Sequence, residues 1–145
     1  MSARADIINR YITVLDATTG ITSVHSELKH HEELGKDQFP AVFPIDGDEA
    51  KTKLCYFSTT YSDDMASTMS VIVTCYVYDE TTGLIESRLS LMQDIEQAIM
   101  TDTSLGRIAD PVPIRIVTDD GQIPKYSIFD IEFENHYMYN HATGG

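Results

Sequence analysis

The residues of this chain that are best suited to chemistry lie near the C-terminus, in the segment FDIEFENHYMYN over 129–140. Asp130, Glu132 and Glu134 alternate there with apolar residues, so a β-strand would carry three carboxylates on one face. Neighbouring carboxylates on that face lie about 6.5 to 7 Å apart. This spacing is too wide for a shared proton, although it suits a loose site for a hard cation. A solvated or interface-facing acidic row is the interpretation that we favour.

A second group of metal-ligand types is the run His-His-Glu-Glu over 30–33. If this run ends a strand, neighbouring side chains point to opposite faces and do not converge on one ion. His136 and His141 are expected at the polar ends of the last strand. Cys55 and Cys75 lack the CxxC spacing of a metal site and are expected to be free thiols in strands. The sequence therefore predicts no metal site and no cofactor.

Motifs of the large enzyme classes are absent from the sequence. It contains no GxSxG for a nucleophilic serine, no GxxxxGK[ST] for phosphate and no GxGxxG for a dinucleotide. An enzymatic or small-molecule-binding domain would have to gather His25, His136 and the three carboxylates around one pocket. We expect that the protein is not an enzyme, and we keep this arrangement as the alternative.

Composition narrows the class of partners. The 145 residues fit one domain, and the formal charge of -13 comes from 23 acidic and 10 basic residues. Clustered Lys and Arg residues, which neutralise phosphates, are missing, so nucleic acid is not expected to bind specifically. The N-terminus does not resemble a signal peptide, and no apolar run is long enough to span a membrane.

Hydrophobic periodicity predicts an α+β order of elements. In sequence, we expect a helix over 7–15 that closes at Gly20, strands over 21–31, 38–48, 53–61 and 67–79, a helix over 81–102, and a hairpin of strands over 112–118 and 129–140. Pro40 and Pro44 place the second strand at a sheet edge or beside an interface. The strand over 67–79 is apolar on both faces. This predicts either a central strand or cover on both sides, by a helix on one face and by another chain or sheet on the other.

The second helix carries the strongest periodic pattern in the chain. Its expected core stripe is Ile85, Leu89, Met92, Ile95 and Ile99, widened by Leu84, Leu91 and Ala98. Together these elements predict one α+β domain over 1–145, with a mixed or antiparallel sheet and two main helices packed on one face.

The order of these features resembles a known family over nearly the whole chain. The features are an N-terminal helix that ends in TTGI, the segment FPAVFPI, a long hairpin with an acidic middle, the helix LIESRLSLMQDIEQAIM and the strand DIEFENHY. In this order they look like the tail terminator, or tail completion, proteins of long-tailed bacteriophages.

The resemblance implies a ring, usually of six subunits, at the head-proximal end of the tail tube. Such a ring stops tube polymerisation and offers a docking surface to the head connector or stopper protein. The implied partners are further copies of the chain, the tail tube protein, the connector and the genomic DNA that passes through the lumen. The implied location is the virion, after assembly in the host cytoplasm. Six copies at -13 each would give the ring a formal charge of -78, which favours a lumen that repels DNA phosphates.

Three sets of residues are expected to serve this role. The acidic row of Asp130, Glu132 and Glu134 is expected in the lumen or at a subunit contact, with Phe129, Ile131 and Phe133 anchored in the core. A flexible loop around 61–68 is expected to contact the tube through Tyr61, Asp63, Asp64 and Met65. The edge strand is expected to contact the next subunit through Phe39, Pro40, Val42 and Pro44. Another neck protein, such as a head-tail connector, is the nearest alternative function.

Overall fold

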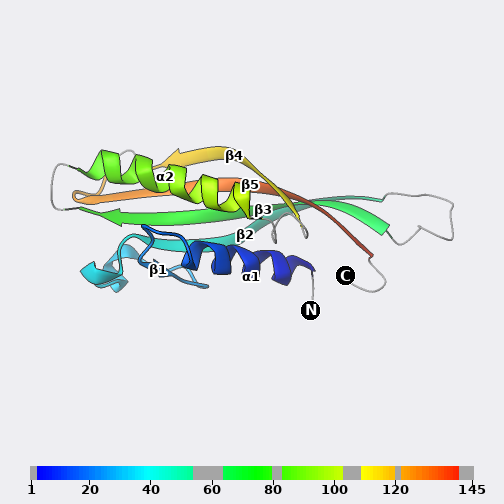
Figure 1. Cartoon of the computed structure of the whole chain (residues 1–145), viewed down its shortest axis with the longest axis horizontal. Coiled ribbons are helices and arrows are strands. Elements are labelled where there is room, and N and C mark those ends of the chain that lie inside the picture. Colours follow the sequence, from blue (N-terminus) through cyan, green and yellow to red (C-terminus); the bar gives the residue numbers. More distant parts are fainter. Residues whose placement is uncertain (1–2, 54–63, 80–82, 103–108, 120–121, 141–145) are drawn as a thin grey trace.

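Five strands form a single sheet with two helices on one of its faces (Figure 1). The structure is a computed structural model that describes residues 3–53, 64–79, 83–102, 109–119 and 122–140. Its elements are α1 (Ala3–Asp16), β1 (Ser23–Val24), the 3-10 turns η1 (His31–Glu33) and η2 (Lys36–Gln38), β2 (Ala41–Lys53), β3 (Asp64–Tyr78), α2 (Leu84–Thr101), β4 (Asp110–Thr118) and β5 (Tyr126–Asn140). The strand order is β1-β2-β3-β5-β4, with β1 parallel to β2 and every other pair antiparallel. The predicted α+β class is confirmed.

The main core lies between the sheet and the helices. Alternate residues of β3 and β5 face it, and the predicted anchors Phe129, Ile131 and Phe133 are confirmed there with exposures of 1% or less. The rest of this layer is Ile7, Tyr11, Val14 and Leu15 from α1, Leu91, Ile95 and Ile99 from α2, Val42, Met69, Val71, Val73, Cys75, Val77 and Tyr137 from the sheet, and Ala109, which precedes β4. Cys75 is a buried free thiol, as expected, whereas Cys55 lies outside the described residues.

A second, smaller core covers one end of the opposite face. Leu34 and Phe39 fold back from the segment between β1 and β2 and pack against Ala41, Phe43 and Tyr76. This layer explains why β3 is apolar on both faces at that end, as the sequence predicted. The cover on the second face comes from the chain's own connecting segment.

The strand predicted over 21–31 is wrong for most of its length. Only Ser23–Val24 pairs with β2. The last contact with β2 is the hydrogen bond from the His25 N–H to the Val42 carbonyl, at 3.0 Å. The chain then leaves the sheet and forms η1, where His30 caps the turn by accepting the Glu32 N–H through Nδ1 at 3.3 Å. The local capping bonds compete with strand pairing for the same backbone groups.

The predicted core stripe of α2 is also partly wrong. Ile95 and Ile99 are buried as expected, but Ile85 and Leu89 are 62% and 54% exposed, and Leu91 is buried in their place. The helix carries more apolar residues than one face can bury. The sheet selects the row through Leu91 and leaves the row through Ile85 and Leu89 at the surface.

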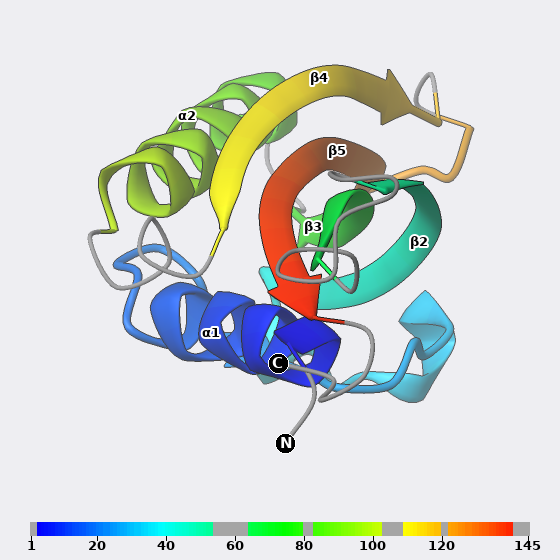
Figure 2. The same cartoon turned by 90° about the vertical axis from the view of Figure 1, so that its right-hand side faces the viewer.

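The long strands β2, β3 and β5 extend past the ends of both helices as a twisted arm (Figure 1). Seen along the molecule, the sheet curls strongly, with both helices on the same side of it (Figure 2). Pairs along the arm run to Lys53 and Met65 between β2 and β3, and to Asp64 and Asn140 between β3 and β5. The strand predicted over 53–61 lies almost entirely outside the described residues.

One buried polar pair joins α1 to the sheet. The Tyr11 hydroxyl donates to Oδ1 of Asn135 at 2.6 Å, and the Asn135 amide donates to the Met69 carbonyl at 3.1 Å. Both side chains have 0% exposure, and burial raises the pKa of Tyr11, so this hydroxyl stays protonated. Because no water replaces a lost partner at such a site, each group depends on the other.

We predict that Tyr11→Phe lowers the free energy of unfolding by about 1 to 3 kcal/mol, because Asn135 Oδ1 is left buried without a donor. Urea unfolding followed by circular dichroism measures this loss. Tyr126→Phe is the matched control, since no hydrogen bond to the Tyr126 hydroxyl is present among the described residues. Equal stability of the two variants would contradict the role given to the Tyr11 hydroxyl.

Candidate assembly surface

The acidic row of Asp130, Glu132 and Glu134 lies on the sheet face opposite the helices, and all three side chains are half-buried. Their β3 neighbours are Thr74, Ile72 and Ser70, in the same order. Hence the row is set in a mixed polar and apolar surface, with one carboxylate at every second residue of β5.

Glu132 is already engaged by both neighbouring strands. Ser70 Oγ donates to its Oε1 at 3.2 Å, and Nη2 of Arg115 lies 3.1 Å from its Oε2. The Arg115 side chain is 68% exposed, so water screens this pair and its contribution to stability is small. Glu134 has a weaker neighbour in His136, whose Nε2 is 3.7 Å from the Glu134 carboxylate.

The β4 edge is the most exposed apolar part of the sheet. Four side chains of this strand are between 39% and 49% exposed: Val112, Ile114, Ile116 and Val117. In the part of the chain that the structure describes, β4 pairs only with β5, so the outer side of its backbone has no strand partner. An apolar strand with an open backbone edge is a template for pairing with another chain.

Sequence reasoning placed the subunit contact at the other sheet edge, and the structure corrects it. Phe39 packs in the small core, with its ring centroid 5.6 Å from that of Tyr126, and Val42 has 0% exposure in the main core. Pro44 is buried and Pro40 is half-buried. Phe39 and Val42 lie in the two cores and Pro44 is buried, so these three side chains are not available to a partner. Pro40 precedes β2, and its carbonyl accepts the Thr22 and Ser23 N–H groups, so the expected edge is paired at that point.

The predicted flexible loop around 61–68 is also corrected. Residues Asp64 to Thr68 belong to β3 and pair with both β2 and β5, so this part of the segment is the middle strand of the arm. Tyr61 and Asp63 lie outside the described residues. Polar composition predicted a loop here, but strand pairing on both sides overrides it.

A four-residue network fixes the base of the arm to α1. Glu49 accepts hydrogen bonds from Ser67 at 2.5 Å and from the Tyr137 hydroxyl, and Nε of Arg4 lies 2.6 Å from its second oxygen. Burial by itself raises the pKa of the Glu49 carboxyl, yet these bonds to Ser67, Tyr137 and Arg4 outweigh it and lower the pKa below its usual value. The charged form of Glu49 therefore stabilises the fold.

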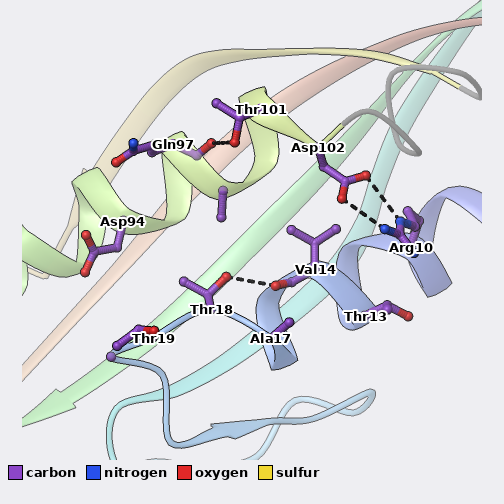
Figure 3. A pocket seen from close by; sticks show the side chains of 12 residues that line it. Arg10, Thr13, Val14, Ala17, Thr18, Thr19, Asp94, Gln97, Thr101 and Asp102 are labelled. Carbon is purple, nitrogen blue, oxygen red and sulfur yellow. Dashed lines mark hydrogen bonds and ion pairs between the residues drawn. The ribbon is translucent and has the colours of Figure 1, made fainter.

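A shallow groove of about 640 Å³ runs between the two helices (Figure 3). Arg10 crosses it to Asp102, with Nη2 3.0 Å from Oδ2, and this pairing raises the pKa of Arg10. The rest of the lining consists of four threonines, small or apolar residues, and Asp94 and Gln97 from α2. Its one cation, Arg10, is already paired with Asp102, which leaves little to recognise an anionic ligand.

An enzymatic or ligand-binding function would require His25, His136 and the three carboxylates to line one pocket. Neither the groove between the helices nor a second hollow in the described residues brings them together. The ring of His25 stacks on Phe43 with centroids 5.1 Å apart, and burial lowers its pKa. His136 lines a hollow of about 330 Å³ on the arm, which includes neither His25 nor the acidic row.

The structure also changes the prediction for the His-His-Glu-Glu run. Because residues 31–33 form a 3-10 turn and not a strand, the rings of His30 and His31 lie on the same side, with centroids 4.2 Å apart. Ligand atoms of His30, His31 and Glu32 come within 4.8 Å of one another. The expectation that these neighbours diverge was wrong.

No protein-family model matches the chain, and no curated protein shows significant similarity to it. Among the helices of the described ranges, none has both the length and the apolar character needed to cross a bilayer.

We predict that Glu49→Gln lowers the free energy of unfolding by about 1 kcal/mol at pH 7, because the ion pair with Arg4 is lost and the bonds to Ser67 and Tyr137 are weakened. The pKa of Glu49 is lower in the folded state than in the unfolded state. Its contribution to the free energy of unfolding is therefore complete when the pH is above the pKa of the unfolded state, and it is lost as the pH falls through the pKa of the folded state. Urea unfolding at pH 7 and below pH 4 should therefore show a difference from the original protein that narrows in acid. A difference that stays constant would contradict the role of the charge.

Proposed function

We propose that this protein is a structural component of a bacteriophage tail, a tail terminator that forms a ring on the head-proximal end of the tail tube. The observation that carries the proposal is the β4 edge, where four exposed apolar side chains accompany an unpaired backbone edge in the described sheet. The order of elements, which resembles that family, supports the specific role.

The β4 edge suits contact between copies of the chain. Exposed apolar side chains on an edge strand favour burial against another protein surface. Ile85 and Leu89 on α2 extend the exposed apolar area of the molecule beyond the sheet. In the proposed ring, β4 of each copy packs against its neighbour, and the ring binds the tail tube protein on one side and the head connector on the other.

The acidic row suits a surface that DNA passes without binding. Three carboxylates of one strand face away from the helices, in a chain with a formal charge of -13. Fixed negative charge repels phosphates and keeps the genome from adhering. In the proposed ring this face lines the lumen, the ring is part of the virion, and it acts without a cofactor and without catalysis.

We predict that Ile114→Lys and Val117→Lys, made separately, raise the concentration needed for ring formation at least about tenfold, since each places a charge in an apolar contact worth more than 1.4 kcal/mol. Sedimentation velocity and native mass spectrometry measure the assembly. Leu28→Lys is the matched control, because Leu28 is also exposed but lies in the segment after β1, away from β4.

Mixing the protein with purified tail tubes distinguishes a tail terminator from another neck protein. Caps at one end of the tube support the terminator, whereas rings that never bind tubes favour another neck protein. A protein that stays monomeric at high concentration, in high salt and with tubes would contradict both.

If the acidic row lines the lumen, DNA binding by a ring with reversed charge on this row should depend on whether the DNA has a free end. Asp130→Lys with Glu134→Lys reverses the charge on the row and leaves the Glu132 bridge to Arg115 in place. Rings of this variant should bind linear duplex DNA at low salt, with an affinity that falls steeply as salt rises, and should bind closed circular DNA poorly because it has no end to thread. Equal binding to linear and circular DNA would place the row on the outer surface.

A further inference from the structure

The turn at η1 brings three metal-ligand side chains together on a segment that no part of the proposed function uses. One ring nitrogen from His30, one from His31 and one Glu32 carboxylate oxygen all lie within 4.8 Å of one another. The backbone of His30 is extended (φ -69°, ψ 147°) and the 3-10 turn begins directly after it. This change of backbone conformation turns both imidazoles to the same side.

His31 supplies a ligand atom that is fixed in position. Its side chain is only 7% exposed and is held by Tyr126 and Tyr76, whose ring centroids are 4.7 and 6.5 Å from its own. Among the described residues, none makes a hydrogen bond to this imidazole. The nitrogens of this imidazole are not among the buried side-chain atoms that lack a hydrogen-bond partner, so they keep contact with solvent. An ion that arrives from solvent can therefore reach them.

We propose that His30, His31 and Glu32 bind one divalent transition-metal ion, of the zinc class, at the surface of the small core. Two imidazoles and a carboxylate are ligands that Zn²⁺ accepts readily, and water would complete its coordination. Bonds of about 2.0 to 2.1 Å require ligand atoms about 3.4 Å apart. His30 and Glu32 are exposed and can rotate to close this gap, while His31 stays in place.

Metal binding would cost one weak hydrogen bond. Nδ1 of His30 accepts the Glu32 N–H at 3.3 Å. If the ion binds Nδ1, it takes the place of the Glu32 N–H at that nitrogen. If the ion binds Nε2, the ring proton lies on Nδ1, which then cannot accept the Glu32 N–H. The freed N–H lies at an exposed turn, where water takes the place of the lost partner. The separate bond from the His30 N–H to Glu33 Oε1, at 3.4 Å, still caps the turn.

The ion would hold the connecting segment against the sheet. His31 contacts Tyr76 and Tyr126, whereas Leu34 and Phe39 follow on the same segment and fill the small core. A ligand that binds only the folded turn stabilises the state in which this segment is docked. We therefore expect Zn²⁺ to raise the melting temperature of the protein.

Isothermal titration calorimetry with Zn²⁺ on the untagged full chain tests the proposal. A large excess of Mg²⁺ in physiological salt occupies the carboxylate surfaces of this acidic protein. We expect one Zn²⁺ per chain, and a loss of affinity of at least about tenfold in His30→Asn and in Glu32→Gln, since each removes a direct ligand. Both residues are exposed, so these variants should fold normally.

His136→Asn is the matched control, because His136 is an exposed histidine beside a glutamate that has no third metal ligand near it among the described residues. It should keep the affinity of the original chain. With Cu²⁺ as a second probe, electron paramagnetic resonance should show two coupled imidazole nitrogens in the original chain and one in His30→Asn. The proposal is overturned by absence of Zn²⁺ binding in excess Mg²⁺, or by His30→Asn and Glu32→Gln binding as tightly as the control.

Discussion

The hydrogen bond between Tyr11 and Asn135 joins α1 to β5 in the register on which the rest of the structure depends. Asn135 is buried on the helix-facing side of β5, and Tyr11 reaches it from α1. A slip of β5 by one residue would exchange its two faces, because side chains alternate along a strand. The three carboxylates of the acidic row would then enter the main core, and Phe129, Ile131 and Phe133 would face water. The buried polar pair and the alternation of apolar and acidic residues along β5 therefore favour the same register.

The position of the helices divides the sheet into parts with different roles. Where α1 and α2 cover it, burial of large apolar side chains supplies most of the stability. Past the helix ends, the arm of β2, β3 and β5 has no such cover, and Glu49 connects it to α1 through Arg4. At the β4 edge, apolar side chains remain exposed although the monomer is already folded. Stability of the monomer thus comes mainly from the helix-covered face, with a smaller core at one end of the other face, and the β4 edge is left for association.

Periodicity in the sequence was sufficient for the elements with a single clear pattern. The alternation of Phe129, Ile131 and Phe133 with the acidic residues predicted both the strand and its orientation, and the class of the fold followed from the order of elements. Periodicity did not predict which face of α2 is buried, because this helix has more apolar residues than one face can bury and only the sheet decides between Leu91 and Leu89. It also did not predict the 3-10 turn after His30, where local capping bonds compete with strand pairing. The β4 edge was missed as a surface, although prolines at 111 and 113 beside apolar residues are typical of an edge strand.

The two outer strands of the sheet are unlike, and this difference constrains the symmetry of any assembly that joins them. One side ends in β4, which is short and apolar, and the other ends in β1 and β2, whose outward-facing stretch from Asp46 carries acidic and basic residues. A contact between unlike edges is head-to-tail, so it repeats by rotation in one direction without a two-fold axis across the interface. Every copy in such a closed assembly points the same way. Its two rims are therefore chemically different, and only one of them can match a given partner.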